Sequence, residues 1–372
     1  MPGPDMIPFA QNPHPAPMAE DARAAILANP GFGTAFTDHM VSIDWAEAHG
    51  WHNAQILPYG PIALDPAAAV LHYAQEIFEG MKAYALEDAG TTAGTMGGIT
   101  LFRPEANAAR FNASARRLAM PEMPPALFVD AVTQLVLADR QWFPTVPGGS
   151  LYLRPFLFAT EAFLGVRPAK AYRFLVIASP AGNYFKSGAS AVSIWVSDYT
   201  RAAAGGTGEA KCGGNYAASL VPTADAFARG HDQVLFLDAA ERKWIEELGG
   251  MNLFFAFDDG SLITPPLGGT ILPGITRDSL LTLARDEGLT VREERYSLDA
   301  WRADAESGKL VEAFACGTAA VVTSVGKVAN ASGAFTIGSG GPGQLTERLR
   351  QRLVAIQRGH APDPHGWVKR IA

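Results

Sequence analysis

Tight turns join several predicted strands of this chain, and they constrain its fold more than any other sequence feature. Residues 233–237 return as 243–247 across a short polar turn, and residues 252–257 return as 261–264 across the Asp-Asp-Gly turn at 258–260. Turns this short connect antiparallel strands, whereas parallel strands need long crossover connections. We therefore expect an α+β fold with largely antiparallel or mixed sheets and helices, not a Rossmann array.

Extended and helical patterns alternate in both halves of the chain. Pro104 suits the first turn of a helix that ends in arginines, and Gly230 suits the left-handed residue that follows a helix. The other expected strands are 37–45, 54–64, 80–84, 99–102, 151–158, 173–178 and 192–197. The expected helices are 105–120, 125–141, one that ends at 229, 277–287 and 345–358.

Length and local composition indicate how the chain divides. A chain of 372 residues favours about two or three domains of ordinary size. Residues 1–30 are rich in Pro and Ala and are expected to form a flexible N-terminal arm. Residues 183–191 have the composition of a linker, so we expect a smaller N-terminal α/β domain over 31–182 and a larger C-terminal domain over 192–372.

Bulk composition argues against several classes of function. A net charge of −7 does not suit a nucleic-acid partner. The long uncharged stretch 260–276 contains three prolines, so no membrane-spanning helix is expected there. Two distant cysteines, Cys212 and Cys316, argue against a disulfide framework and fit a cytoplasmic protein. The histidines show no metal-binding spacing, so no metal is expected.

Lys211 lies between two glycine clusters, in the run GGTGEAKCGGNY at 205–216. The glycines let the backbone fold tightly around one long side chain, and a crowded amine becomes the nucleophile that Schiff-base chemistry requires. The other seven lysines, including Lys82, are interpreted as residues of ordinary turns, helix flanks or tails. Taken alone, the run fits a mobile glycine loop with a solvated lysine equally well, and it completes neither a dinucleotide-binding motif nor a P-loop.

Further candidate residues follow Lys211 in the sequence. Glu246 and Glu247 end a predicted strand, where adjacent side chains face opposite ways, so we expect one to be solvated and the other buried. The segment 264–277 enters a helix through a Pro-Gly turn, and backbone N–H groups at that helix start could bind a phosphate. The small-residue turn at 316–320 offers a hydroxyl, and Arg110 could add positive charge. Each also has an ordinary interpretation: a structural ion pair, a plain turn around Thr318, and a surface helix arginine.

Together these residues match the needs of pyridoxal 5′-phosphate, which are an amine for attachment, a carboxylate for the ring nitrogen and a phosphate cradle. Five strings carry a resemblance in chain order: FEGMKAY at 78–84, LFRP at 101–104, YLRP at 152–155, KCGGNY at 211–216, and the segment 264–277. In these strings the chain resembles the branched-chain amino acid aminotransferases of the fold-type IV (class IV) pyridoxal-phosphate family, over residues 32–367.

The resemblance implies a two-domain fold-type IV enzyme, D-amino acid aminotransferase-like, with pyridoxal 5′-phosphate as cofactor in the C-terminal domain and the active site at the domain interface. Lys211 would hold the cofactor through a Schiff base and then move a proton between substrate and cofactor. Glu247 would keep the ring nitrogen protonated, and Tyr216 would hydrogen-bond the ring hydroxyl. The resemblance assigns phosphate binding to Arg110, Arg201, Ile275, Thr276, Gly317 and Thr318.

The resemblance also implies a substrate pocket, with some of its residues contributed across a homodimer interface. An aromatic wall selects branched apolar side chains by shape and burial. Arg154 would place the second carboxylate of glutamate or 2-oxoglutarate, and a purely structural arginine is the alternative. Residues 320–323 lack the Cys-x-x-Cys pair of some family members, so no thiol switch is expected. The implied pocket residues are Phe32, Tyr73, Phe78, Tyr152, Gly250 and Ala319.

The implied reaction is reversible transfer of the amino group of L-leucine, L-isoleucine or L-valine to 2-oxoglutarate, giving branched 2-oxo acids and L-glutamate. D-amino acid aminotransferases and aminodeoxychorismate lyases share the lysine and the glutamate but differ in the pocket, and the strings at 78–80 and 152–154 favour the branched-chain group. A non-catalytic carrier of pyridoxal phosphate would not need Glu247 or Tyr216. The expected partners are therefore small-molecule substrates, without nucleic acid or membrane.

Overall fold

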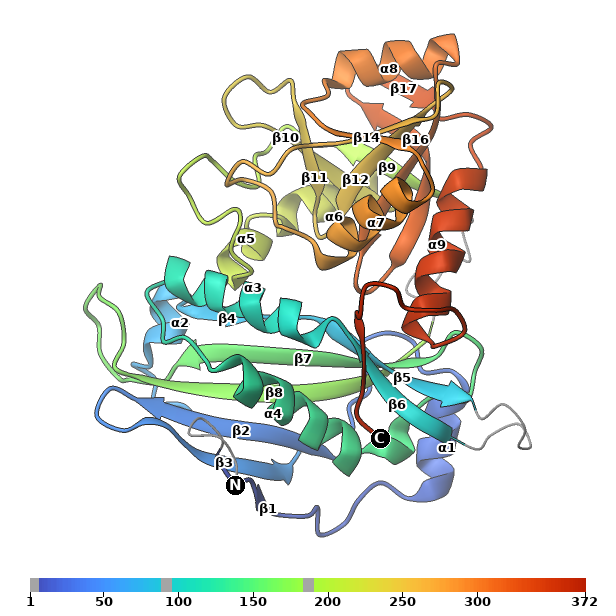
Figure 1. The fold of residues 1–372 in the computed structure, drawn as a ribbon. Coiled ribbons are helices and arrows are strands. Elements are labelled where there is room, and N and C mark those ends of the chain that lie inside the picture. The colour runs from blue at the N-terminus through green and yellow to red at the C-terminus, as the bar shows by residue number, and fades with distance from the viewer. Residues whose placement is uncertain (1–6, 88–95, 183–190) are drawn as a thin grey trace. The chain divides into compact units, whose positions relative to one another are not determined.

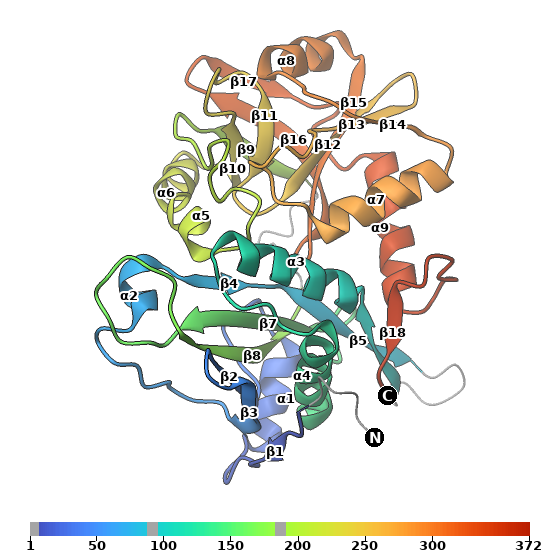
Figure 2. The ribbon, with the colours of Figure 1, turned by 60° about the vertical axis from the view of Figure 1, so that its left-hand side comes forward.

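A computed structural model describes residues 7–87, 96–182 and 191–372 of the chain (Figures 1 and 2). The chain divides into two compact units. The first comprises Met1–Lys186, Lys211–Gly213 and Ile356–Ala372, and the second comprises Ser187–Ala210 and Gly214–Ala355. Residues 1–6 of the predicted arm and 183–190 of the predicted linker lie outside the described residues, so the predicted domain boundaries stay predictions.

The first unit is built on one sheet with the strand order β1-β3-β2-β8-β7-β5-β6-β18, and β4 pairs with β7. Its paired strands are antiparallel, apart from the parallel pair of β1 and β3. The strands are β1 Ala10–Gln11, β2 His39–Ala46, β3 Gly50–Pro58, β4 Glu76–Phe78, β5 Met81–Glu87, β6 Met96–Phe102, β7 Ser150–Ala159, β8 Ala171–Ala181 and β18 Val368–Arg370.

Two helices, α3 and α4, cover one face of this sheet (Figure 1). Phe111 of α3, Phe128 of α4 and Phe174 of β8 contact one another in the core, with ring centroids 5.3 to 5.9 Å apart. As predicted, a proline begins α3 and two arginines lie in its last turn. The helices are α1 Glu20–Ala28, α2 Ala69–Tyr73, α3 Pro104–Arg117 and α4 Pro125–Ala138, with a short 3₁₀ helix at Arg140–Trp142.

The second unit also contains one sheet, with the order β11-β10-β9-β16-β15-β12-β13-β14 and with β17 on β16. β9 is parallel to β10 and to β16, β13 is parallel to β14, and the other pairs are antiparallel. The strands are β9 Ala191–Val196, β10 Gln233–Leu237, β11 Ile245–Leu248, β12 Asn252–Phe257, β13 Ser261–Thr264, β14 Thr290–Glu293, β15 Leu310–Gly317, β16 Val321–Asn330 and β17 Gly333–Thr336. Both predicted hairpins, β10–β11 and β12–β13, are present.

Helix α8 packs against this second sheet through aromatic side chains. Trp301 of α8 contacts Phe255 of β12 and Phe335 of β17, with ring centroids 4.9 and 5.6 Å away. Gly230 follows α6 with φ of 80°, as its predicted left-handed position requires. The helices are α5 Gly213–Ala217, α6 Leu220–Ala228, α7 Ile275–Asp286, α8 Leu298–Ser307 and α9 Gln344–Gln357.

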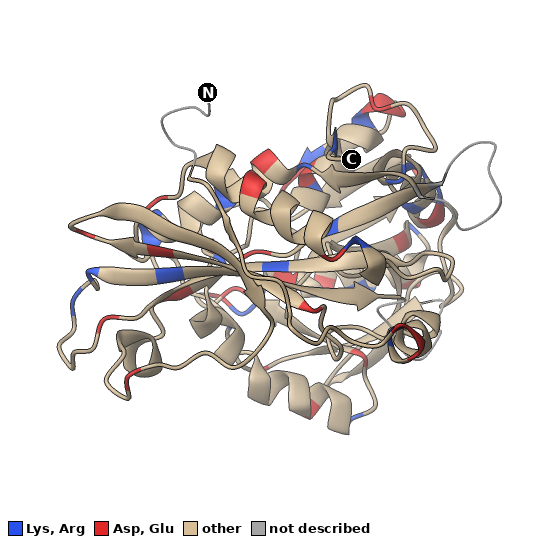
Figure 3. Cartoon of the chain, turned by 90° about the horizontal axis from the view of Figure 1, so that it is seen from below, with Lys and Arg blue, Asp and Glu red and all other residues tan. Residues whose placement is uncertain are grey.

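These mixed sheets with helices confirm the predicted α+β class. The structure differs from the prediction at element ends, where β3 ends at Pro58 and α3 at Arg117, and in elements that were not predicted. These are β1, α1 (which lies in the expected arm), α2, β4, β14, α8, β15, β16, β17 and β18. Within the described residues, every helix is too short or too polar to cross a membrane. Charged residues of both signs are interspersed along the strands and helices (Figure 3).

Candidate active-site residues in each unit

Lys211 is fixed through its main chain in the first unit. Its N–H donates to Ser114 Oγ of α3 at 2.9 Å, and its carbonyl accepts from the N–H of Phe78 at 2.9 Å. Its Nζ lies 4.7 Å from the centroid of the Phe78 ring. The backbone is therefore held on both sides and the amine rests on an aromatic face, which favours a positioned amine over a solvated loop lysine.

Two glycines allow the side chains around Lys211 to approach the main chain closely. A Cβ at Gly213 would collide with the Glu76 carboxylate, which accepts a hydrogen bond from the Gly213 N–H. A Cβ at Gly80 would collide with the Tyr152 hydroxyl. Burial raises the pKa of Glu76, although the Gly213 N–H and Arg154 oppose the rise. These close approaches explain why the motifs around 80 and 213 need glycine.

Four predicted pocket residues gather near Lys211 in the first unit. Phe32 meets Tyr152 edge to face at 4.9 Å, and the guanidinium of Arg154 lies 4.7 Å from the Phe78 ring centroid. Arg154 Nη2 donates to the Tyr152 hydroxyl at 3.1 Å. Arg154 Nε is buried with no hydrogen-bond partner among the described residues.

Tyr73, which was also predicted to line the pocket, has a different setting in this unit. It ends α2 and is 38% exposed. Its hydroxyl donates to the carbonyl of Leu164 at 2.5 Å. Its predicted role in the pocket therefore stays a prediction.

Arg110 forms a buried ion pair with Glu79. Arg110 Nε lies 2.7 Å from Glu79 Oε1 and Nη2 lies 2.8 Å from Oε2, while the Asn107 amide also donates to Oε2 at 2.8 Å. Burial alone would raise the pKa of Glu79, but Arg110, Lys211 and Asn107 together hold it below its ordinary value. A phosphate on Arg110 would share that guanidinium with Glu79, so the predicted phosphate role stays a prediction.

Lys82 differs from its prediction as an ordinary turn lysine. It lies in strand β5 and is 7% exposed. Burial, helped by the charge of Arg358, lowers the pKa of Lys82 to about 8. The prediction was wrong because Met81, Lys82 and Ala83 are all buried, so this part of β5 lacks the solvated face that a lysine usually marks.

Glu247 is held by side-chain and main-chain partners in the second unit. It is 3% exposed, and its Oε1 lies 2.5 Å from Arg201 Nη2. The N–H of Leu272 donates to Oε1 at 3.1 Å, and the amide of Asn252 donates to Oε2 at 3.4 Å. Asn252 was not predicted; its position as the first residue of β12, five residues after Glu247, is the signal that could have identified it.

Glu246 is buried as well, which corrects the expectation that one glutamate of the pair is solvated. It is 7% exposed, and its Oε1 accepts a hydrogen bond from Thr270 Oγ1 at 2.5 Å. Burial raises the pKa of Glu246 against the opposing effects of Thr270 and Arg201. Strand alternation does send the two side chains to opposite faces, but all four residues of β11 are buried, so both faces are covered.

The glycine loop before Lys211 is shaped by Arg201 and Asn215. Arg201 Nη2 donates to the carbonyls of Gly208 and Thr270. The Asn215 amide donates to the carbonyls of Thr207 at 2.7 Å and Ala210 at 2.8 Å. A Cβ at Gly208 would collide with the backbone of Thr270. Asn215 was missed as a structural residue, although it lies in the string that carried the resemblance.

The predicted phosphate-binding turns lie at one end of neighbouring strands in the second unit. Asn252 pairs with Cys316 at the start of β12 and the end of β15, and a Cβ at Gly317 would lie 3.4 Å from the Gly250 carbonyl oxygen. Gly274 caps α7 without space for a side chain, because a Cβ there would collide with Asn252. The structure thus brings Glu247, Gly250 and Gly317 to the same end of the sheet as the N-terminus of α7.

The other predicted residues of this unit lie on adjoining segments. Ile275 and Thr276 form the first turn of α7, Thr318 and Ala319 follow β15, and Tyr216 is half-buried on α5. Val321, which begins β16 directly after that turn, has φ of 62°. A β-branched residue with positive φ stores backbone strain, and such strain is often found at functional sites.

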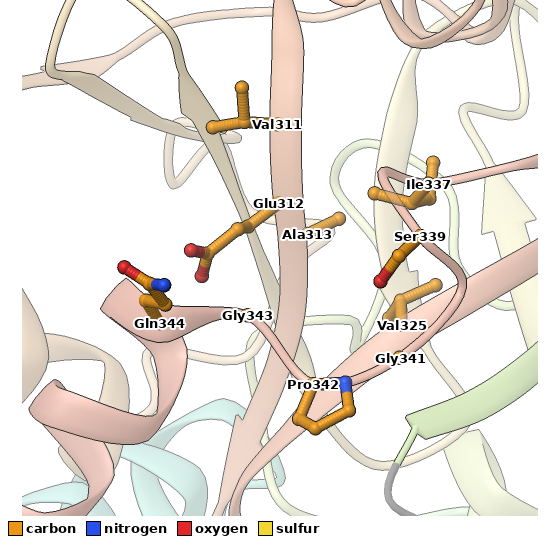
Figure 4. A pocket seen from close by; sticks show the side chains of 10 residues that line it. All are labelled: Val311, Glu312, Ala313, Val325, Ile337, Ser339, Gly341, Pro342, Gly343 and Gln344. Carbon is orange, nitrogen blue, oxygen red and sulfur yellow. The ribbon is translucent and has the colours of Figure 1, made fainter.

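A cavity of about 240 Å³ adjoins the N-terminus of α9 (Figure 4). Glu312 of β15 points toward the helix, and its carboxylate accepts from the N–H groups of Leu345 and Thr346 at 2.9 and 2.8 Å and from Thr346 Oγ1 at 2.9 Å. A Cβ at Gly343 would collide with this carboxylate. Glu312 therefore caps α9, and its hydrogen-bonding capacity is used by the chain itself.

Comparison with known proteins identifies the family. The sequence matches the amino-transferase class IV family over residues 76–328. It is 57% identical over 362 residues to a probable branched-chain-amino-acid aminotransferase of Streptomyces coelicolor, covering 97% of this chain and 98% of that protein. It is 55% identical over 368 residues to the branched-chain-amino-acid aminotransferase of Mycolicibacterium smegmatis, covering 98% of each.

A solved structure agrees with these relatives. The branched-chain amino acid aminotransferase of T.th., complexed with N-(5′-phosphopyridoxyl)-L-glutamate, superposes with a TM-score of 0.71 at 28% identity, covering 89% of this chain and 99% of that one. The chain belongs to the class IV aminotransferase family. The predicted family and the predicted fold-type IV architecture are thereby confirmed.

Proposed function

We propose that this chain is a branched-chain amino acid aminotransferase, which transfers an amino group reversibly between L-leucine, L-isoleucine or L-valine and 2-oxoglutarate. The observation that carries the proposal is the setting of Lys211, whose amine rests on Phe78 within a cluster that contains Tyr152 and Arg154. The names of the full-length relatives support the same activity.

Pyridoxal 5′-phosphate is the proposed cofactor, and the residues present fit it. A buried carboxylate, Glu247, is paired with a cation, and the N-terminus of α7 beside it suits a phosphate. The solved relative contains a phosphopyridoxyl group. When bound, the cofactor supplies an aldehyde that takes up the amino group and a ring that accepts electrons.

The residues of the chain have separate tasks in this proposal. Lys211 attaches the cofactor through Nζ and, once released, moves a proton to and from the substrate α-carbon. Glu247 holds a proton on the ring nitrogen, and Arg201 stabilises the negative charge that Glu247 needs for this. Tyr216 donates to the ring hydroxyl.

Phosphate binding is proposed for a set of residues drawn from turns and from two arginines. Helix N-terminal N–H groups and guanidinium groups are the usual protein partners of phosphate. Arg110 and Arg201 already pair with the carboxylates of Glu79 and Glu247, so a bound phosphate would share each guanidinium with a glutamate. The proposed residues are Arg110, Arg201, Ile275, Thr276, Gly317 and Thr318.

The substrate pocket is proposed around the aromatic cluster of the first unit. The rings of Phe32, Phe78 and Tyr152 provide an apolar wall for a branched side chain. Arg154 Nε is buried without a partner among the described residues, which suits a guanidinium that awaits the second carboxylate of glutamate or 2-oxoglutarate. Tyr73, Gly250 and Ala319 complete the proposed pocket, and we propose a cytoplasmic homodimer.

The test is the absorption spectrum of the purified protein with its cofactor, before and after addition of L-leucine or D-alanine. We expect L-leucine alone to remove the band of the lysine-bound cofactor. Lys211→Ala should lack that band and should lose activity by about 10³-fold or more. Lys309→Ala is a matched control, because Lys309 is an exposed lysine paired with Asp304 at 3.5 Å, and it should behave like the parent protein.

Other outcomes would redirect the proposal. A response to D-alanine alone would assign the protein to the D-amino acid branch of the family. A bound cofactor that no amino acid alters would favour a non-catalytic carrier. Failure to bind pyridoxal 5′-phosphate at all would overturn the cofactor assignment.

A further inference from the structure

The second unit contains a cavity of about 360 Å³ whose lining includes none of the residues proposed above for cofactor or substrate. It is bounded by β11, by the turn between β10 and β11, and by the proline-rich segment that follows β13. Its walls combine apolar side chains with a buried acid and an exposed arginine. Among its lining residues are Ala203, Trp244, Glu246, Pro265, Thr270 and Arg295.

Glu246, which lines this cavity, has an unsatisfied acceptor atom among the described residues. Its side chain is more than nine-tenths buried, and Thr270 occupies Oε1. Its Oε2 is shielded from solvent and has no hydrogen-bond partner in the described part of the chain. An acceptor left unpaired in such a place costs free energy, so a donor that enters the cavity gains from meeting it.

Two other acids that line cavities of this unit, Asp238 and Glu312, accept hydrogen bonds from the chain. Asp238, which lines the same cavity, accepts from the backbone N–H groups of Ala240, Glu241, Lys243 and Trp244 at 2.7 to 3.2 Å. Glu312, beside the cavity at α9, accepts three hydrogen bonds from the start of that helix. Glu246 therefore differs from both in having one oxygen for which the described residues provide no donor.

We propose that this cavity is a second ligand site, which binds a small organic molecule through a primary ammonium group donated to Glu246 Oε2. An ammonium is compact and carries three donors, so it matches a single available oxygen. A guanidinium would need two oxygens for its fork, and Thr270 already occupies the other one. Trp244, Pro265 and Ile271 line the same cavity and suit an aliphatic chain on the ligand.

The site is connected to the proposed active-site carboxylate. Thr270 donates to Glu246 through Oγ1 and accepts from Arg201 through its carbonyl oxygen. Arg201 in turn pairs with Glu247 at 2.5 Å. A cation at Glu246 changes the electrostatic field at Arg201, so ligand binding here is expected to alter the turnover rate. This coupling rests on the proposed function, whereas binding itself does not.

The experiment is calorimetric titration of the holoenzyme with isopentylammonium chloride. We expect Glu246→Gln to weaken binding about tenfold or more, because a charge-assisted hydrogen bond is lost. Glu306→Gln removes one negative charge at an exposed position of α8 and should bind like the parent protein. Any reaction of the amine at the cofactor would occur in the parent protein and in both variants. The difference in isopentylammonium affinity between Glu246→Gln and the other two proteins therefore reports on the second site.

Two further arms identify the ligand chemistry. Tetramethylammonium carries the charge without N–H donors and should bind more weakly than isopentylammonium. L-Leucine is isopentylamine with an added carboxylate, and Arg295 at the cavity could receive it. If the natural ligand is an amino acid, Arg295→Gln should weaken Glu246-dependent binding of L-leucine and leave binding of isopentylammonium unaffected. If Arg295→Gln changes the binding of neither compound, the ligand is an amine without a carboxylate.

The proposal fails if neither compound shows binding that depends on Glu246. Melting temperatures of the variants must first show that they are folded. Ala204→Trp provides an independent route, because Ala204 is an exposed lining residue whose enlargement would fill the cavity without touching the carboxylate. Unchanged isopentylammonium binding in Ala204→Trp would also overturn the assignment. Binding at this site without a change in turnover would remove only the coupling to Glu247.

Discussion

The two units hold their proposed active-site residues by different means. In the first unit, Lys211 is positioned by hydrogen bonds of its main chain, and the nearby Glu79 carboxylate is fully buried against Arg110 and Asn107. In the second unit, Glu247 is held through its side chain, because its carboxylate pairs with Arg201. The same guanidinium also donates to two backbone carbonyls. Breaking either buried ion pair should therefore lower stability, and substitution of Glu247 should in addition affect the proposed chemistry directly.

The largest expected effect is the loss of stability on breaking the Glu79–Arg110 pair. Glu79→Leu leaves a guanidinium that is only 9% exposed without its carboxylate, and the free energy of unfolding should fall by about 3–5 kcal/mol. Urea unfolding measures the change. The double variant Glu79→Leu/Arg110→Met should recover most of the loss, because two apolar side chains leave no buried charge. A loss below about 1 kcal/mol in the single variant would show that the first unit does not depend on this pair.

The next largest effect tests chemistry in the second unit. Glu247→Gln keeps an acceptor for the Leu272 N–H but removes the negative charge, so we expect kcat to fall about 10²-fold. Steady-state kinetics with L-leucine measure this loss. Glu294→Gln, at an exposed acid 3.7 Å from Arg292, is the charge-matched control and should retain full activity. An unchanged kcat in Glu247→Gln would contradict both the electronic role and the contrast between the units.

The sequence predicted the elements that carry local signals. Pro104, the arginines of α3 and Gly230 act within one helix turn, and the hairpin turns act within a few residues, so these features could be identified without tertiary information. Helix α8 was missed although it carries such signals, because Ser297 caps its start and Gly308 follows its end with φ of 80°. The contacts of Trp301 with Phe255 and Phe335, which hold α8 on the sheet, depend on tertiary packing.

The motifs named candidate site residues, but they did not predict which side chains are buried. Lys211 was named by its glycine-flanked run and Glu247 by the family resemblance, and their roles stay predictions. Glu246 and Lys82 were misjudged because both lie in strands covered on both faces, where alternation no longer distinguishes core from solvent. The partners Ser114, Asn215 and Asn252 are polar residues whose roles arise from long-range or loop contacts, which sequence spacing alone does not encode.

A pH experiment tests Lys82, a second buried ionisable residue of the first unit. The pKa of Lys82 is about 8 in the folded chain and lies near its ordinary, higher value in the unfolded chain. Between these values the unfolded chain binds more protons, so this residue makes the free energy of unfolding rise with pH, by at most about 1.4 kcal/mol per pH unit.

The measurement is urea unfolding of the parent protein and Lys82→Met from pH 7.5 to 9.5. The parent should gain stability relative to Lys82→Met as the pH rises through 8, because the cost of burying the charge disappears. Lys369→Met is the control: Lys369 is an exposed lysine of β18 paired with Glu105 at 2.7 Å, and its profile should parallel that of the parent. Parallel profiles for Lys82→Met would mean that the buried lysine keeps its ordinary pKa.

The smallest effect is expected at Ser114, which tests whether main-chain anchoring positions Lys211. Ser114→Ala removes the acceptor for the Lys211 N–H, and the free energy of unfolding should fall by about 1 kcal/mol. Because the lysine backbone then loses one of its anchors and keeps the carbonyl bond to Phe78, kcat should also fall by a small factor. Thr133→Val is the matched control, since it removes a hydroxyl that bonds only within α4, to Val129 at 2.8 Å. If both variants lose stability but only Ser114→Ala loses kcat, the hydrogen bond of Ser114 positions the amine in addition to stabilising its helix. If kcat is equal in the two variants, Phe78 and the glycines suffice to hold Lys211.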